Sequence, residues 1–253
     1  MHLFPIKRFS IGTLIAAIVL ASCSTANDRA ISRPDGVNRL DNAMRAGSTP
    51  FVIADFRTDW HLTNESAPTR AHRLDAVYGS DAPDDVRTVS SVEGTFTRPD
   101  SRQTLVVLNR GEANASSPEP RPSMVAIFEN DKLLTQFLYP DTRYDLAVNV
   151  KDVDGDRLDD ILFTRSAYQM GTLYVSAEVV GFANANRIVL NRLGQSYINS
   201  CDSSNPDRDI KAARFVMAQS STDPTSIARE PYRSACPSDD NNTSLDSFHL
   251  FNF

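Results

Sequence analysis

Residues 148–163 carry the strongest structural signal in this chain, and they read Val-Asn-Val-Lys-Asp-Val-Asp-Gly-Asp-Arg-Leu-Asp-Asp-Ile-Leu-Phe. Two apolar runs, 144–150 and 161–163, flank a segment in which five of nine residues, 152–160, are aspartates. Short apolar runs bounded by turn-forming residues are typical of β-strands. The stretch therefore predicts two strands joined by an acidic loop.

The aspartates of this loop predict a metal site. Carboxylates packed so closely repel one another, and a hard divalent cation with oxygen ligands relieves that repulsion. The alternating residues Asp152, Asp154 and Asp156 can point at one centre, and the backbone carbonyl of Leu158 and the carboxylate of Asp160 can complete the shell. We expect Ca²⁺ as the cofactor, because it accepts irregular shells of about six to eight oxygens. The alternative is a solvated acidic turn that binds no ion.

The loop does not follow the EF-hand pattern, which requires glycine at the sixth position and glutamate at the twelfth. Counted from Asp152, Gly155 is fourth and Phe163 is twelfth. The flanking segments also lack the helical periodicity of an EF-hand.

Residues 148–163 instead resemble an FG-GAP (VCBS-type) repeat, which forms blades of the β-propellers of integrin α-subunits and many bacterial surface proteins. The resemblance implies calcium ligands at Asp152, Asp154, Asp156, the carbonyl of Leu158, and Asp160. The family usually has glycine at the position of Arg157. If that residue takes a positive φ, arginine adds strain of about 1 kcal/mol or more.

A second, degenerate copy of the repeat spans residues 92–107, at an offset of 56 residues. It keeps the apolar–turn–apolar shape but retains only Asp100 among the acidic positions. A period of this size is close to the length of one propeller blade.

Many short apolar runs separated by turns predict an all-β fold. We expect a propeller-like domain or a partial propeller of FG-GAP-type blades over residues 51–253, with an antiparallel β-sandwich as the alternative. Residues 129–132 predict a hairpin turn, and residues 248–253 predict a final edge strand. Residues 111–122 and most of 219–244 are expected to be loops. The runs expected as strands are 51–54, 104–108, 123–128, 133–138, 144–150, 161–165, 172–181, 187–190 and 214–217.

Residues 1–22 predict a lipoprotein signal peptide. Lys7 and Arg8 precede a short apolar run, and Leu-Ala-Ser-Cys at residues 20–23 resembles a bacterial lipobox. The resemblance implies that Cys23 is acylated and becomes the N-terminus, followed by a flexible tether to residue 50. In a Gram-negative cell Ser24 then implies the outer membrane, on its periplasmic side or at the cell surface. The alternative is an ordinary secretory signal that is cleaved near residue 21 or 22.

The remaining cysteines, Cys201 and Cys236, predict a disulfide, because they form an even pair in an exported, oxidising compartment. A bridge between them closes a loop of about 36 residues and, on the chain-entropy model, stabilises the fold by roughly 3–4 kcal/mol. Two free buried thiols are the alternative.

The net charge of the chain and the lack of known catalytic motifs argue against several classes of function. The formal net charge of -6 and the lack of basic runs argue against a nucleic-acid binder. No Gly-x-Ser-x-Gly elbow, zinc-protease motif or phosphate-binding glycine loop is present, so no catalytic residue is predicted. We expect a membrane-tethered binding or scaffolding module with a protein or glycan partner. One alternative is an envelope hydrolase with an acidic cleft, which a convergence of His61 or His72 with acidic groups in a deep pocket would support. The other is an accessory subunit of an outer-membrane assembly.

Overall fold

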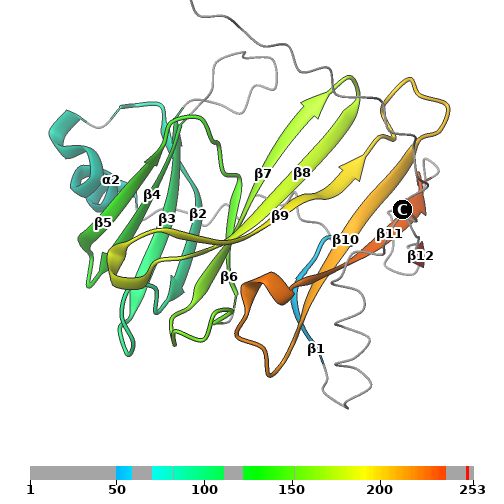
Figure 1. Cartoon of the computed structure of the whole chain (residues 1–253). Coiled ribbons are helices and arrows are strands. Elements are labelled where there is room, and N and C mark those ends of the chain that lie inside the picture. The colour runs from blue at the N-terminus through cyan, green and yellow to red at the C-terminus, as the bar shows by residue number, and fades with distance from the viewer. Residues whose placement is uncertain are drawn as a thin grey trace, which may run out of the picture. The chain divides into compact units, whose positions relative to one another are not determined.

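Antiparallel β-strands make up nearly all of the regular structure in the described part of the chain (Figure 1). The computed structural model describes residues 50–58, 70–81, 83–110, 122–150, 152–237 and 249–250. The predicted signal peptide, Cys23, the tether up to residue 49 and His61 lie outside these residues, as does the side chain of His72. The predicted all-β class is confirmed. A strongly curled sheet and a second, smaller sheet are consistent with a partial propeller or a β-sandwich.

The smaller sheet is an antiparallel meander in the order β2-β3-β4-β5. The predicted turn joins β4 and β5, where Glu129 pairs with Lys132. Asn130 and Asp131 between them both have positive φ, 49° and 61°, as a type I′ turn requires. The strands are β2 (Val86–Gly94), β3 (Gln103–Arg110), β4 (Ser123–Glu129) and β5 (Lys132–Tyr139).

The larger sheet follows the order β12-β11-β10-β9-β8-β7-β6, and β1 also pairs with β10. Strand β9 pairs with residues 210–212 of β10 and β1 with residues 214–218, so the two strands share one edge of β10. The strands are β1 (Pro50–Asp55), β6 (Leu146–Val150), β7 (Asp160–Gln169), β8 (Thr172–Gly181), β9 (Ile188–Asn199), β10 (Asp209–Ala218), β11 (Ala228–Ala235) and β12 (His249–Leu250).

Side chains join the two sheets where β2 and β6 lie next to each other. The fully buried hydroxyl of Ser90 donates to the carbonyl of Ala147 at 3.0 Å and accepts the N–H of the same residue at 3.1 Å. The amide of Asn149 donates to the carbonyl of Glu93 at 3.1 Å. These contacts replace a backbone ladder between the two edge strands.

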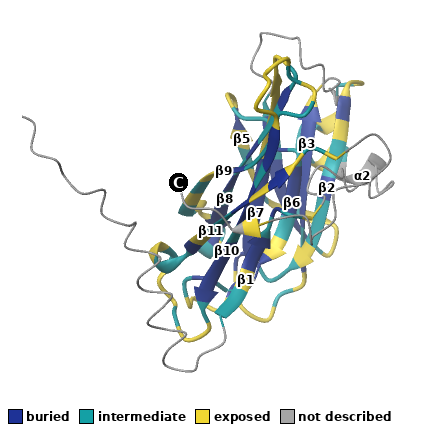
Figure 2. Ribbon diagram, turned by 90° about the vertical axis from the view of Figure 1, so that its right-hand side faces the viewer, coloured by how far each residue is buried: buried dark blue, intermediate teal, exposed yellow. Residues whose placement is uncertain are grey.

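The larger sheet separates two hydrophobic cores, because successive side chains of a strand point to opposite faces. Ile161 and Phe163 of β7 pack against β3 and β4, whereas Leu162 packs toward β1 and β10. Buried residues accordingly run along the strands, whereas β5 and the second half of β7 also carry exposed residues (Figure 2).

The structure adds regular elements that the sequence patterns do not predict. Helix α2 (Arg70–Tyr78) packs Leu74 and Val77 against the outer face of the smaller sheet. A short 3-10 turn, η1 (Gly79–Asp81), follows α2, and two others, η2 (Ala183–Ala185) and η3 (Pro224–Ser226), connect strands.

Strand β11 corrects the expectation of a loop over most of residues 219–244. Its Pro231 suggests a loop, but proline lacks only one backbone donor and is tolerated near a sheet edge. Here Pro231 faces Ala213 of β10, while on the other side the described residues of β12 pair with Tyr232 and Arg233. Of the predicted C-terminal edge strand over residues 248–253, the described residues 249–250 form β12 at the edge of the larger sheet.

Candidate metal centre

The acidic loop connects β6 to β7, and Val150 pairs with Asp160 at its base. Asp152 organises the loop, since its Oδ1 accepts the N–H of Gly155 at 2.6 Å and its Oδ2 that of Arg157 at 2.8 Å. Short carboxylate side chains bind nearby backbone N–H groups in this way and fix tight turns. The loop therefore owes its conformation to the residues predicted as ligands.

Two residues of the loop have a left-handed backbone, Gly155 with φ 83° and Arg157 with φ 70°. A Cβ on Gly155 would lie 2.7 Å from Cγ2 of Thr222, so this position requires glycine for space as well as for φ. Arg157 has the positive φ that favours glycine, and it carries the corresponding strain.

Asp152, Asp154 and Asp156 converge. One carboxylate oxygen from each lies within 4.8 Å of the others, which is close enough for the group to hold a metal ion. Burial and the charges of Asp156 and Asp152 raise the pKa of Asp154. The cluster is partly open to solvent, so an ion can reach it.

Asp160 lies at the base of the loop and is only 1% exposed. Its Oδ2 accepts the N–H of Val153 at 2.7 Å. Burial, and to a lesser extent the charges of Asp154, Asp156 and Asp152, raises its pKa to about 8. A buried carboxylate next to three others is an unfavourable arrangement unless a proton or a cation compensates the charge.

Leu158 anchors the loop to the protein interior. Its side chain is 5% exposed, and its N–H donates to Oδ1 of Asp156 at 2.8 Å. The structure thus brings together three predicted ligands and places Leu158 and Asp160 at the end of the same loop.

Asp159 has a role that sequence reasoning missed, because it joins the two sheets. Its backbone N–H donates to the carbonyl of Thr95 at 2.8 Å. Its Oδ2 accepts from the backbone N–H of Thr95 at 2.7 Å and from the Thr95 hydroxyl at 2.9 Å. The acidic loop is therefore tied to the loop between β2 and β3.

Gln103 takes the place of Asp160 in that β2–β3 loop. It pairs with Gly94 at the base of its hairpin, as Asp160 pairs with Val150. Its Oε1 accepts the N–H groups of Phe96 and Thr97, both at 3.0 Å, and its Nε2 donates to the Thr97 hydroxyl at 2.7 Å. A neutral amide thus completes the loop that lacks an acidic cluster. The 56-residue offset hides this correspondence, because the acidic loop is one residue longer.

Comparison with protein-family models, curated proteins and solved structures finds no match for this chain. Among the residues that the structure describes, no helix is long and apolar enough to cross a membrane. The predicted disulfide is present between Cys201, which follows β9, and Cys236, which follows β11, with a Cα–Cα distance of 5.5 Å.

Proposed function

We propose that this chain is a lipid-anchored cell-envelope protein whose β-domain is braced by Ca²⁺ and acts as a binding or scaffolding module. The observation that carries the proposal is the convergence of Asp152, Asp154 and Asp156, in the same loop as the buried carboxylate of Asp160 on which their charges act. A cation held there would link β6 and β7 and offset the repulsion between the carboxylates.

The hydrogen bonds of the loop support a cation with oxygen ligands. Asp154, Asp156 and Asp160 each use one carboxylate oxygen to accept a backbone N–H. Among the described residues, no hydrogen bond reaches their second oxygens. Those of Asp154 and Asp156 are available to a metal, whereas Oδ1 of Asp160 lies beside Gly181 of β8, outside the group of three. Calcium suits this loop better than magnesium, because it accepts mixed, irregular oxygen shells whereas magnesium demands an octahedron.

The arrangement of the strands supports the FG-GAP resemblance. The four-stranded sheet β2–β5 and the first four strands of the larger sheet, β6–β9, are both meanders. Each begins with a hairpin whose loop is closed by a buried polar side chain, Gln103 or Asp160. Repeated blades of this kind build propellers. We therefore assign the acidic loop to an FG-GAP-type blade and the chain to the binding proteins of the envelope, with a protein or glycan partner.

Thermal unfolding of the full chain tests the calcium site. In excess EDTA the melting temperature should be lowest. Calcium at about a hundred times its dissociation constant should add about 2.7 kcal/mol, which raises the melting temperature by about 5–10 °C in a chain of this size. Magnesium at the same concentration should have a much smaller effect.

Matched variants separate ion binding from general charge effects. Asp154→Asn with Asp156→Asn keeps the turn-forming oxygens and should abolish the calcium response. Asp100→Asn with Asp207→Asn removes the same charge from exposed positions and should leave the response intact. If calcium does not change the melting temperature of the wild type, the loop is only an acidic turn that binds no ion.

The lipid anchor is tested separately by labelling cells with a palmitate analogue. The wild-type chain should take up the label and sediment with membranes. Cys23→Ser should be unlabelled, and an unchanged label in this variant would refute the lipobox assignment.

A further inference from the structure

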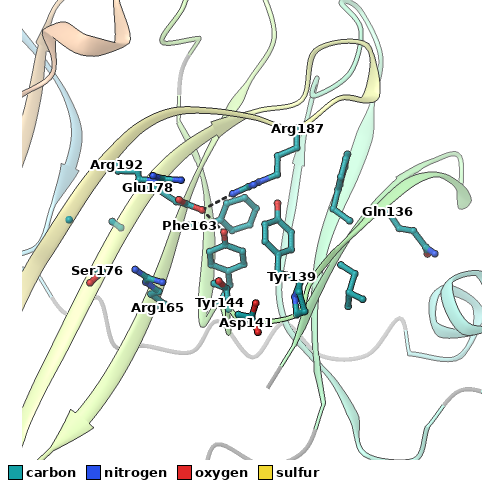
Figure 3. A pocket seen from close by; sticks show the side chains of 16 residues that line it. Gln136, Tyr139, Asp141, Tyr144, Phe163, Arg165, Ser176, Glu178, Arg187 and Arg192 are labelled. Atoms are coloured by element: carbon teal, nitrogen blue, oxygen red, sulfur yellow. Dashed lines mark hydrogen bonds and ion pairs between the residues drawn. The ribbon is translucent and has the colours of Figure 1, made fainter. Parts of the chain in front are cut away.

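A cavity of about 820 Å³ lies where the smaller sheet stops covering the larger one, between β5 and strands β7–β9 (Figure 3). On β7 the core residue Phe163 is followed on the same face by Arg165. Across the ladder Phe163 faces Glu178, and Arg165 faces Ser176. The apolar face of the sheet thus becomes polar within two residues, at the point where the core ends.

Aromatic rings close the inner side of this cavity. Tyr144 stacks on Phe163 with ring centroids 4.5 Å apart, and Tyr139 meets Tyr144 edge-on at 4.9 Å. All three residues are buried. They form the inner wall, and both polar residues and apolar ones such as Leu138 line the accessible part of the cavity.

The cavity is lined by more cationic than anionic side chains. It is lined by three arginines, Arg165, Arg187 and Arg192, and by two carboxylates, Asp141 and Glu178. Glu178 is engaged by Arg187 at 3.2 Å and by the Tyr144 hydroxyl. Among the described residues, no ion pair involves Arg165 or Arg192. The cavity therefore carries a net positive charge in a chain whose formal net charge is -6.

The Tyr139 hydroxyl is a second group of interest, because Arg187 acts on it without a hydrogen bond of standard geometry. It lines the cavity, is buried, and takes no hydrogen bond of standard geometry within the described residues, although Arg187 lies over its ring at 4.7 Å. Buried polar groups are nearly always hydrogen-bonded, and the exceptions often mark a site for a ligand or an ion. A phenolic hydroxyl can donate to an acceptor placed in the cavity.

We propose that this cavity binds a small polyhydroxylated molecule that carries a carboxylate or a phosphate. Arginine presents several donors in a planar fork that matches the oxygens of both groups. Gln136, Thr142 and Ser176 supply donors and acceptors for hydroxyls. The volume suits a small-molecule ligand and exceeds what an inorganic anion needs. The site does not depend on the calcium loop.

Protein-observed NMR titration of the full chain tests the proposal with four probes at equal ionic strength: D-glucuronate, D-glucose 6-phosphate, D-glucose and inorganic phosphate. At least one charged sugar should shift cavity resonances saturably, with a dissociation constant about tenfold or more below that of glucose. The comparison of the two charged sugars distinguishes carboxylate from phosphate. The proposal would be overturned if neither charged sugar caused a saturable shift. It would also be overturned if glucose bound as tightly as the charged sugars, or if inorganic phosphate did.

Variants locate the binding. Arg165→Gln and Arg192→Gln should each lower the affinity for the charged sugar about tenfold or more, because charge-assisted hydrogen bonds are stronger than those between neutral groups. Arg87→Gln removes the same charge from an exposed position outside the cavity and should leave affinity unchanged. Tyr139→Phe should weaken binding with little change in the melting temperature, since phenylalanine keeps the ring under Arg187 and the hydroxyl makes no hydrogen bond of standard geometry. Unchanged affinity in all three cavity variants would place the ligand elsewhere.

Discussion

Asp160 differs from the other carboxylates of the acidic loop, because it is almost completely buried and still close to their charges. Without a cation, burial and like charge both oppose its ionisation, so a neutral group of the same size should suit the site better. We predict that Asp160→Asn is more stable than the wild type in excess EDTA at pH 7, by at least about 1 kcal/mol. In saturating calcium the order should reverse. Thermal melts of both proteins in the two buffers provide the measurement.

Gln103, the equivalent residue in the smaller sheet, provides a control for the predicted reversal of the order of stability. Gln103→Glu places a carboxylate where a neutral amide is satisfied by Phe96 and Thr97, and it should destabilise the fold in both buffers. If Asp160→Asn were the less stable protein even in EDTA, the buried charge would not be a source of strain.

Arg157 takes a backbone conformation that glycine adopts without strain. Arg157→Gly should therefore stabilise the protein by about 1 kcal/mol relative to Arg157→Ala, which shortens the side chain but keeps the Cβ. Urea unfolding of the two variants gives the comparison. Equal stability would mean that the surrounding hydrogen bonds, including that from the Arg157 N–H to Asp152, already absorb the strain.

At the scale of elements, Asp159 connects two hairpins that belong to different sheets. Its carboxylate accepts two hydrogen bonds from Thr95, and both residues are half-buried. Asp159→Ala removes the acceptor and leaves the Thr95 donors unsatisfied, which should lower the free energy of unfolding by about 1–3 kcal/mol. The loss should be similar in EDTA and in calcium, as measured by chemical denaturation.

Asp207→Ala is the matched control, because this exposed carboxylate accepts no hydrogen bond from the described residues. A loss at Asp159 that appeared only in calcium would instead assign this residue to the ion.

Local patterns were sufficient to predict most strands and the acidic loop. Alternation and turn residues locate the hairpin at 129–132, and the spacing of aspartates brings Asp152, Asp154 and Asp156 together. Such features depend on neighbours a few residues away, which a single sequence displays. The Cys201–Cys236 bridge was also accessible, because only one pairing remains once Cys23 is set aside.

Features assembled from distant segments could not be predicted in the same way. The partner of Asp159 is 64 residues away, and the arginine-lined cavity needs β5 to end beside β7–β9. Strand β11 is stabilised by its pairing with β10, although its Arg-Glu-Pro sequence favours a loop. In each case the determining contact is between sheets or strands, and the local sequence does not specify it.

At the scale of the whole molecule, the disulfide fixes the far end of the curled sheet. It joins the end of β9 to the end of β11 across β10, over a sequence separation of 35 residues. Constraining a loop of this length in the unfolded chain should contribute about 3–4 kcal/mol on the chain-entropy model. Cys201→Ser with Cys236→Ser should therefore lower the melting temperature by roughly 10 °C. The wild type in reductant should reach the same value, because both lose the same cross-link. A variant that melts like the oxidised wild type would show that strand pairing alone holds this end of the sheet.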